Sequence, residues 1–188
     1  LSLYLMLDEP IWRETVLSIK YFENLVIARI AKSVPTIKAW LNCMTLVVDN
    51  TFLNVIFKAN PNYIKFVWTE ISEHLKEFTL EVMLLVRACI GLESFRAKMQ
   101  DGVFVSMLVS QFVAEEMKIG RKNETLLFSC YEVVHYLGTN NLGKDVLLKN
   151  KGLHECFRRR LREGDEVCKI VIRVMQMLIV NCEKSDLD

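Results

Sequence analysis

The amino-acid sequence predicts an all-α protein, built as a superhelical stack of short helical repeats, and three observations support this prediction. Apolar residues recur at the three- and four-residue spacing of helices rather than at the two-residue spacing of strands. The 188 residues include only seven glycines and three prolines, and no hairpin signal such as Asn-Gly stands between alternating segments. Nearly apolar helices alternate with ordinary amphipathic helices at a spacing in the low forties, which is typical of solenoid repeats.

Four of the predicted helices are apolar on most of their circumference and carry only a narrow polar stripe. They cover residues 36–49, 79–91, 124–138 and 166–180. The stripe residues are Lys38, Asn42, Thr45 and Asp49 in the first helix, Arg87 in the second, Thr125, Ser129, Glu132 and either His135 or Tyr136 in the third, and Glu166, Lys169, Arg173 and Gln176 in the fourth. Because so little of their surface is polar, we expect other helices to cover them on several sides.

Ordinary amphipathic helices are predicted between these four, at residues 62–76, 103–118 and 153–163. Self-alignment supports a repeat, because Thr79 and Thr125 open similar helices 46 residues apart and the next buried helix begins near Glu166. We expect one repeat domain over residues 1–188, with three to four repeats. Residues 1–34 are only generically helical and are interpreted as N-terminal cap helices. Since the chain begins with Leu1 rather than Met, we expect a segment of a longer protein.

Charge and cysteine content indicate the environment of the chain. The net charge is +1 and 25% of the residues are charged, so no strong overall field attracts nucleic acid or a membrane surface. Six scattered cysteines form no C-x-x-C pair, which favours free thiols in a reducing, intracellular compartment. No signal peptide or membrane-spanning segment is visible, since the most apolar run, residues 170–180, is too short. We expect a cytoplasmic protein, with the nucleus as the alternative.

One stretch, "GTNNLGKD", fits the frame of a phosphate-binding loop through Gly138, Gly143 and Lys144. Such a loop must follow a β-strand, and its Ser or Thr must hold Mg²⁺. Here a predicted helix precedes it, and Asp145 replaces the hydroxyl residue, where its carboxylate would repel phosphate. The pattern therefore does not predict nucleotide binding.

Other candidate chemistry is weak. A zinc site from His154, Cys156, Cys168 and Cys182 fits no compact ligand spacing. The histidines His74, His135 and His154 are far apart, and no Ser or Cys nucleophile sits in a recognisable turn. We expect no metal, no cofactor and no catalytic residue, and thus a protein that is not an enzyme.

The last part of the chain, "LGTNNLGKDVLLKNKGLHECFRRRLREGDEVCKIVIRVMQML", resembles an armadillo repeat. In that family a buried helix ends at a bend, a short helix follows, a glycine opens the next helix, and a polar turn leads to a long inner helix. Gly138 to Asn141 match the bend, Gly143 to Lys149 the short helix, Gly152-Leu153 the glycine step, and Glu163 to Glu166 the polar turn. Glycine suits both bends because it accepts a positive φ. Weaker echoes begin at Gly91 and at Asp49.

The resemblance implies a non-catalytic scaffold or adaptor. In armadillo proteins the inner helices line a groove that binds an extended peptide or a helix of another protein. By the match to inner helices, the groove residues here are Lys38, Asn42, Arg87, Glu132, Lys169, Arg173 and Gln176. The sequence lacks the Trp and Asn ladder of the importin type, because Met44 stands one turn after Trp40. It also lacks the strongly basic groove of the catenin type, because the acidic Glu132 stands among the predicted groove residues.

Two further features concern partners. The basic run Arg158, Arg159, Arg160 and Arg162 is predicted on an outer helix, directly before Glu163, Asp165 and Glu166. We interpret it as a solvated face that neutralises itself, with an acidic protein partner as the next interpretation and nucleic acid as a weaker one, because no aromatic residues interleave the arginines. The terminal helices of a stack cannot cover their own apolar faces, so a structural or regulatory domain that self-associates through these end faces, as a homodimer, is the alternative function.

Overall fold

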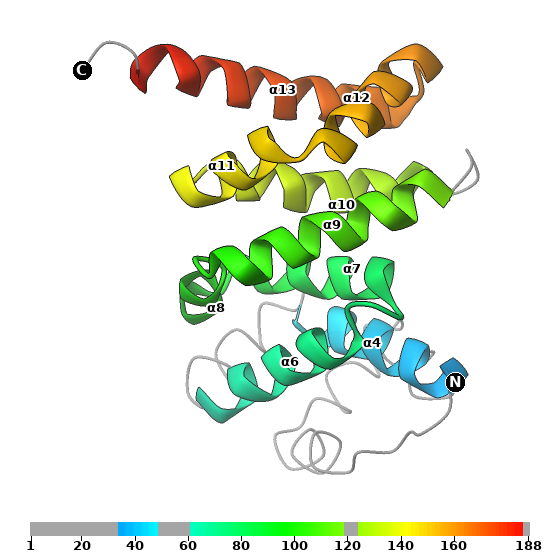
Figure 1. Ribbon diagram of the computed structural model, residues 1–188. Helices are drawn as coiled ribbons and strands as arrows, with labels where there is room; N and C mark the ends of the chain where they lie inside the picture. Colours follow the sequence, from blue (N-terminus) through cyan, green and yellow to red (C-terminus); the bar gives the residue numbers. More distant parts are fainter. Residues whose placement is uncertain (1–33, 49–60, 119–123, 186–188) are drawn as a thin grey trace. The chain divides into compact units, whose positions relative to one another are not determined.

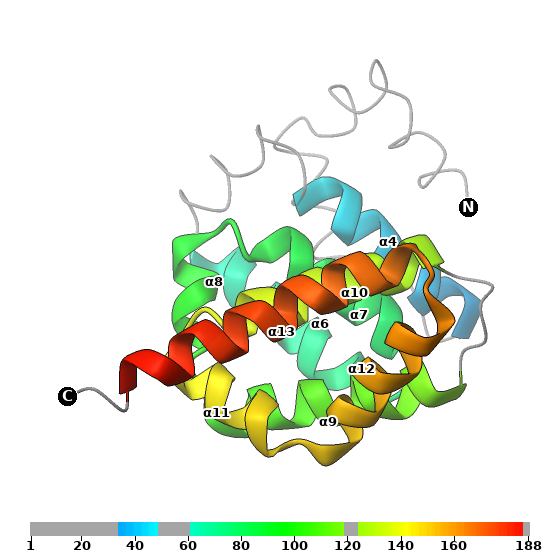
Figure 2. The ribbon, with the colours of Figure 1, turned by 90° about the horizontal axis from the view of Figure 1, so that it is seen from above.

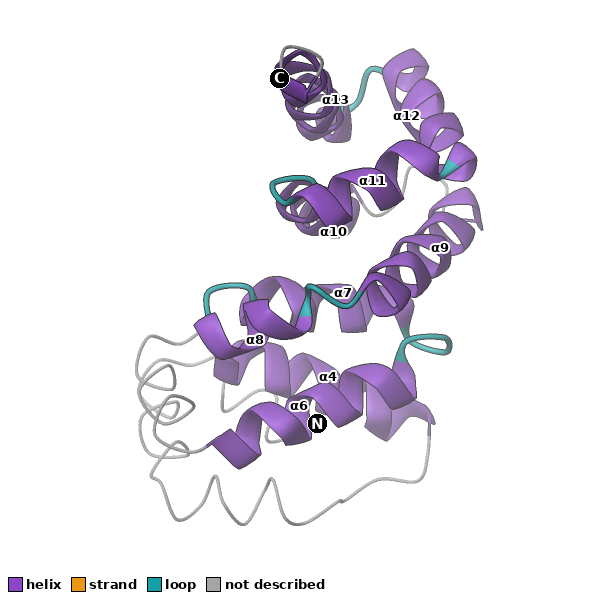
Figure 3. Cartoon of the chain, turned by 60° about the vertical axis from the view of Figure 1, so that its left-hand side comes forward, coloured by secondary structure: helices purple, strands orange, loops and turns teal. Residues whose placement is uncertain are grey.

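The computed structural model describes residues 34–48, 61–118 and 124–185, and this part of the chain contains helices and no strand (Figures 1 and 3). The all-α prediction is confirmed. The predicted cap helices over residues 1–34 lie outside the described residues except for Val34, and so does the segment 49–60. Among the described helices, none combines the length and the apolarity that crossing a lipid bilayer requires.

The chain divides into two compact units, Leu1–Arg96 and Ala97–Asp188, and each is described by itself. The single repeat domain expected from the sequence stays a prediction. The boundary falls within the short helix α8, Glu93–Lys98.

Unit 1 (Leu1–Arg96) contains α4 (Val34–Val48), α6 (Pro61–His74) and α7 (Thr79–Cys89). Helix α7 packs against both α4 and α6. The side chains of Val82, Met83, Leu85, Val86 and Cys89 are all 0% exposed, so α7 is covered on several sides. This matches the prediction for residues 79–91, whose only charged residue in mid-helix, Arg87, is exposed.

In the described residues of unit 2 (Ala97–Asp188), five helices follow α8 in chain order. They are α9 (Gly102–Lys118), α10 (Glu124–Leu137), α11 (Asn141–Lys149), α12 (Lys151–Glu163) and α13 (Glu166–Ser185). Helix α13 packs along α10, while α12 contacts both α9 and α13, and α11 contacts α9 and α10 (Figures 1 and 2). The predicted helices at 103–118, 124–138, 153–163 and 166–180 all form.

Asparagine and aspartate side chains start four helices of unit 2, because each accepts a hydrogen bond from an otherwise unpaired backbone N–H of the first turn. Asp101 accepts from Val103 and Phe104, Asn140 from Gly143, Asn150 from Leu153, and Asp165 from Cys168. Asn150 also ends the preceding helix, since its own N–H donates to the Leu147 carbonyl. One residue therefore separates α11 from α12.

The glycines of the predicted bends serve a different purpose from the one expected. Among the described residues only Gly164, which ends α12, has a positive φ, 64°. At Gly138 the thioether of Met177 occupies the space that a Cβ would need, and at Gly143 that space is taken by the Leu137 carbonyl. A Cβ at Gly152, inside the first turn of α12, would lie 2.8 Å from Val113 Cγ1. These three glycines allow close packing of helices, so the positive-φ explanation for Gly138 and Gly152 is wrong.

Candidate protein-binding surface

The seven predicted groove residues fall in two groups, one in each unit. Lys38 and Asn42 lie on α4 and Arg87 on α7, in unit 1; Glu132 lies on α10 and Lys169, Arg173 and Gln176 lie on α13, in unit 2. Each is exposed or half-buried. A continuous groove lined by all seven stays a prediction, whereas the geometry within each unit can be described.

In unit 1, polar contacts connect α4 to α6 and α7. The Lys38 Nζ lies 2.6 Å from Glu81 Oε1 on α7, and the Lys38 side chain is 59% exposed. The indole N–H of Trp40 donates to Glu70 Oε2 on α6 at 3.2 Å. Lys38 thus already has an acidic neighbour, so its charge is partly neutralised within the unit.

In unit 2, the exposed side of α13 carries both cationic and apolar residues. Lys169, Arg173 and Gln176 are exposed, and so are Ile172 and Ile179, at 42% and 58% of their surface. With about 100° of rotation per residue, all of these side chains fall within one arc of roughly 120° on the helix. We call this arc the α13 face. Residues Val167, Ile170, Val171, Val174 and Leu178 point the opposite way and are buried.

The α13 face is divided lengthwise. Ile172 and Ile179 lie along one edge, continued by the half-buried Cys168 and Met175. Lys169, Arg173 and Gln176 lie along the other, and the exposed Val180 continues their line one turn further on. Lys169 Nζ contacts Glu166 Oε2 one turn earlier at 2.6 Å, on the exposed surface. Arg173 makes no hydrogen bond or ion pair with any residue that the structure describes.

The basic run on α12 is not the solvated face that the sequence suggested. Arg158 and Arg162 are exposed, but Arg159 is only partly so, and the Arg160 side chain is 1% exposed. The interpretation of four solvated arginines is therefore wrong for Arg160, which cannot contact a partner. In the basic run, only Arg158 and Arg162 are fully available at the surface. The Nη1 of Arg158 already lies 3.0 Å from Glu155 Oε2.

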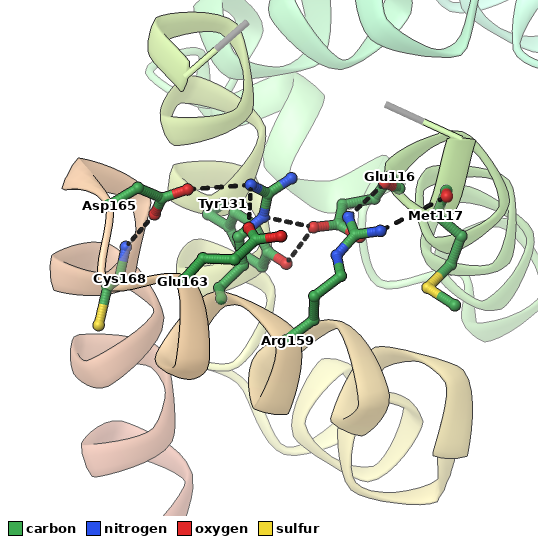
Figure 4. Close-up of polar contacts among 8 residues, drawn as sticks. Glu116, Met117, Tyr131, Arg159, Glu163, Asp165 and Cys168 are labelled. Atoms are coloured by element: carbon green, nitrogen blue, oxygen red, sulfur yellow. Dashed lines mark hydrogen bonds and ion pairs between the residues drawn. The ribbon is translucent and has the colours of Figure 1, made fainter. Parts of the chain in front are cut away.

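Arg159 and Arg160 belong to a buried ionic network with Glu116, Tyr131, Glu163 and Asp165 (Figure 4). Arg160 Nε donates to Glu116 Oε1 at 2.7 Å, while its Nη1 donates to Glu163 Oε2 and Asp165 Oδ2, both at 2.9 Å. Arg159 Nη2 donates to the carboxylate and to the backbone carbonyl of Glu116. The network joins the end of α9 to the end of α12 and the start of α13.

Burial and charge shift the pKa values of this network. Burial disfavours a charged guanidinium, but the hydrogen bonds and charges of Glu116, Asp165 and Glu163 outweigh it, and the pKa of Arg160 is raised. Burial, followed by the charge of Glu116, raises the pKa of the Tyr131 phenol. The same two causes raise the pKa of the Cys156 thiol from 9.0 to about 12. Both groups are therefore neutral at physiological pH, and Arg160 is charged.

Sequence reasoning missed this network, although a signal for it existed. On α9, Glu116 continues the buried stripe of Val105, Leu108 and Phe112, and on α12, Arg160 continues the buried stripe of Leu153 and Phe157. A charged residue in register with an apolar stripe predicts a buried partner of opposite sign. Each of the two helices supplies one such residue.

The described residues offer little for a metal ion or a nucleotide. Among the described residues one group could hold a metal ion, namely Glu70, Glu73 and His74 on α6. Its buried member, Glu70, already accepts from Trp40, and His74 Nε2 lies 3.5 Å from the same oxygen. In the apparent phosphate loop, α10 precedes Gly138, and the Gly143 N–H donates to Asn140 Oδ1 at 2.7 Å rather than facing an open loop. The stretch is a junction between two helices.

Comparison of the chain with protein-family models, with curated proteins and with solved structures gives no significant match. The resemblance to armadillo repeats therefore depends on the residues quoted above, and the surface has to be interpreted from its own chemistry.

Proposed function

We propose that the chain is a non-catalytic protein-binding domain, an armadillo-type scaffold or adaptor that holds a peptide or helix of another protein on its inner helices. The α13 face supports this proposal most directly. It presents long polar side chains and isoleucines together, and Arg173 has no polar contact with the rest of the described chain. Exposed apolar surface rimmed by polar residues is typical of protein-interaction sites.

The polar side chains suit a partner with carboxylates or backbone carbonyls. A partly desolvated charged hydrogen bond contributes about 1.5–3 kcal/mol, so one lost contact weakens binding by roughly ten- to a hundred-fold. The fold does not depend on these side chains, since they are among the most exposed on the helix.

Site-specific photo-crosslinking in cells tests the proposal. A photoreactive amino acid replaces Gln176 on the α13 face or, as a matched control, Arg162 on α12, which is also exposed. We expect a covalent adduct with another protein at position 176 and none at position 162. Adducts at position 162 alone would place the partner on the outer helices and refute the groove assignment.

The alternative function, self-association through the end of the helix stack, is favoured by the same two isoleucines. Ile172 and Ile179 are large apolar residues that remain exposed on the last helix. In the same experiment, an adduct at position 176 with a second copy of the chain would support this alternative.

A further inference from the structure

The chemistry of the α13 face specifies one kind of partner. We propose that this face binds an amphipathic α-helix that bears carboxylates along one edge. This inference rests on the proposed protein-binding function and adds the shape and charge of the partner. It follows from the spacing of the apolar residues and from the position of the cations.

The apolar edge of the face has the spacing of a helix–helix seam. Cys168, Ile172, Met175 and Ile179 follow one another at intervals of four, three and four residues. This is the a/d pattern with which two helices pack side by side, each residue of the seam inserting between side chains of the other helix. The seam covers twelve residues, and its ends are about 16 Å apart along the helix at a rise of 1.5 Å per residue, so a partner of about three to four turns covers it.

The cations lie on one side of this seam only. Lys169 and Arg173 are one turn apart, and Gln176 continues their line. No carboxylate of the described chain contacts Arg173, and Lys169 contacts only the exposed Glu166. A helix docked on the seam would bring one of its edges beside these cations, and carboxylates on that edge would complement them.

An extended peptide fits the face less well than a helix. Recognition of an extended backbone needs side-chain amides or a free strand edge to bond its N–H and C=O groups. On the α13 face only Gln176 offers an amide. A helical partner satisfies its own backbone hydrogen bonds and requires only side-chain contacts, which this face provides.

Fluorescence anisotropy with three synthetic probes tests this inference on the full chain. The first probe is a stapled four-turn helix with leucines at its a and d positions and glutamates along one edge. The second has lysines in place of the glutamates. The third keeps the leucines and glutamates of the first but carries prolines at other positions, which prevent it from forming a helix. We expect the first probe to bind at least about ten-fold more tightly than either of the others.

Three double variants of the protein make the result specific. Lys169→Glu with Arg173→Glu should reverse the preference, so that the lysine probe binds about ten-fold more tightly than the glutamate probe. This gain of binding requires folded protein, so unfolding cannot imitate it. Ile172→Asp with Ile179→Asp should weaken both helical probes more than ten-fold. The matched control, Arg158→Glu with Arg162→Glu, makes the same charge change on exposed residues one turn apart on α12 and should leave all affinities unchanged.

Three results would overturn the inference. Equal affinity for the glutamate and lysine probes would refute the acidic edge. Equal affinity for the helical and proline-containing probes would refute the helix, while an adduct at position 176 would still support protein binding. Light scattering that shows a dimer, converted to a monomer by Ile172→Asp, would identify a second copy of the chain as the occupant of the face.

Discussion

Glu116 and Arg160 carry opposite charges in the interior of unit 2, where their side chains are 0% and 1% exposed. Moving a charge out of water is costly, and the attraction between the two groups offsets this cost only while both are present. Arg160 also donates to Glu163 and Asp165, and Glu116 accepts from Arg159, so each charge has more than one partner. Two nitrogens, Arg159 Nε and Arg160 Nη2, are buried without a hydrogen-bond partner among the described residues.

Glu116→Ala should therefore destabilise the protein by about 3–5 kcal/mol, because it leaves the Arg160 guanidinium buried with less compensation. Urea unfolding measures this loss. Arg158→Ala removes an exposed ion pair on the same helix as Arg160 and should change stability by less than about 0.5 kcal/mol. Replacing the pair together, with Glu116→Leu and Arg160→Met, should recover part of the loss. Equal effects of Glu116→Ala and Arg158→Ala would show that the network contributes nothing.

The raised pKa of Cys156 predicts a loss of stability at alkaline pH. The unfolded thiol releases its proton near pH 9.0, whereas the folded thiol keeps it to about pH 12. The stabilising difference is fully present below pH 9.0 and is lost as the pH rises towards 12, because the unfolded state then binds fewer protons. The slope is at most about 1.4 kcal/mol per pH unit for this group. Urea unfolding across this window should show a shallower fall for Cys156→Ala, and an unchanged slope would contradict the assignment.

Some glycines of the chain decide how closely two neighbouring helices can approach. A Cβ at Gly143 would meet the Leu137 backbone carbonyl, which cannot rotate away as a side chain can. Gly164 has open space around it but a φ of 64°, so its constraint is conformational. Gly91 has neither constraint, since no atom lies within 4 Å of the added Cβ and its φ is not positive.

Three alanine substitutions separate these causes. Gly143→Ala should destabilise by about 1–3 kcal/mol through overpacking between α10 and α11. Gly164→Ala should cost about 1 kcal/mol through its left-handed backbone. Gly91→Ala should be neutral or slightly stabilising, because alanine restricts the unfolded chain. Differential scanning calorimetry orders the three, and an effect of Gly91→Ala as large as that of Gly143→Ala would refute the steric explanation.

Helices were predictable from the sequence because the three- and four-residue spacing of apolar residues that indicates a helix is visible within a short stretch of the chain. The stripe of Lys169, Arg173 and Gln176 identified the exposed side of α13 for this reason. The burial of Glu116 and of Arg160 could be predicted from their places in apolar stripes, but their pairing could not, since it joins residues 44 positions apart and depends on how α9 and α12 pack. The explanation of the glycines failed for the same reason, because the Met177 thioether that fills the space at Gly138 comes from a helix far along the chain.

The network and the packing of α10 on α13 both lie within unit 2. Tyr131 of the network and the buried Phe112 and Phe157, whose rings pack against it, also belong to this unit. Residues 97–188 far exceed the roughly 40 residues below which domains need disulfides or metals to fold.

A fragment of residues 97–188 should therefore keep its helical circular dichroism and unfold cooperatively. If the α13 face is sufficient for binding, the fragment should also bind the glutamate-edged probe as tightly as the full chain. A helical fragment that binds at least ten-fold more weakly would instead implicate Lys38, Asn42 or Arg87 of unit 1. A fragment without cooperative unfolding would contradict the independence of unit 2.

The contact between Met177 and Gly138 makes the packing of α13 sensitive to oxidants. The sulfur and the terminal methyl group of Met177 fill a space that exists only because residue 138 has no side chain, and Leu147 borders the same space. Oxidation of the thioether would add a polar oxygen to a site shaped for a methyl group and an apolar sulfur. The sulfoxide would have to leave this site or displace the end of α10. Peroxide would thus loosen the attachment of the helix that carries the α13 face, and methionine sulfoxide reductase would restore it.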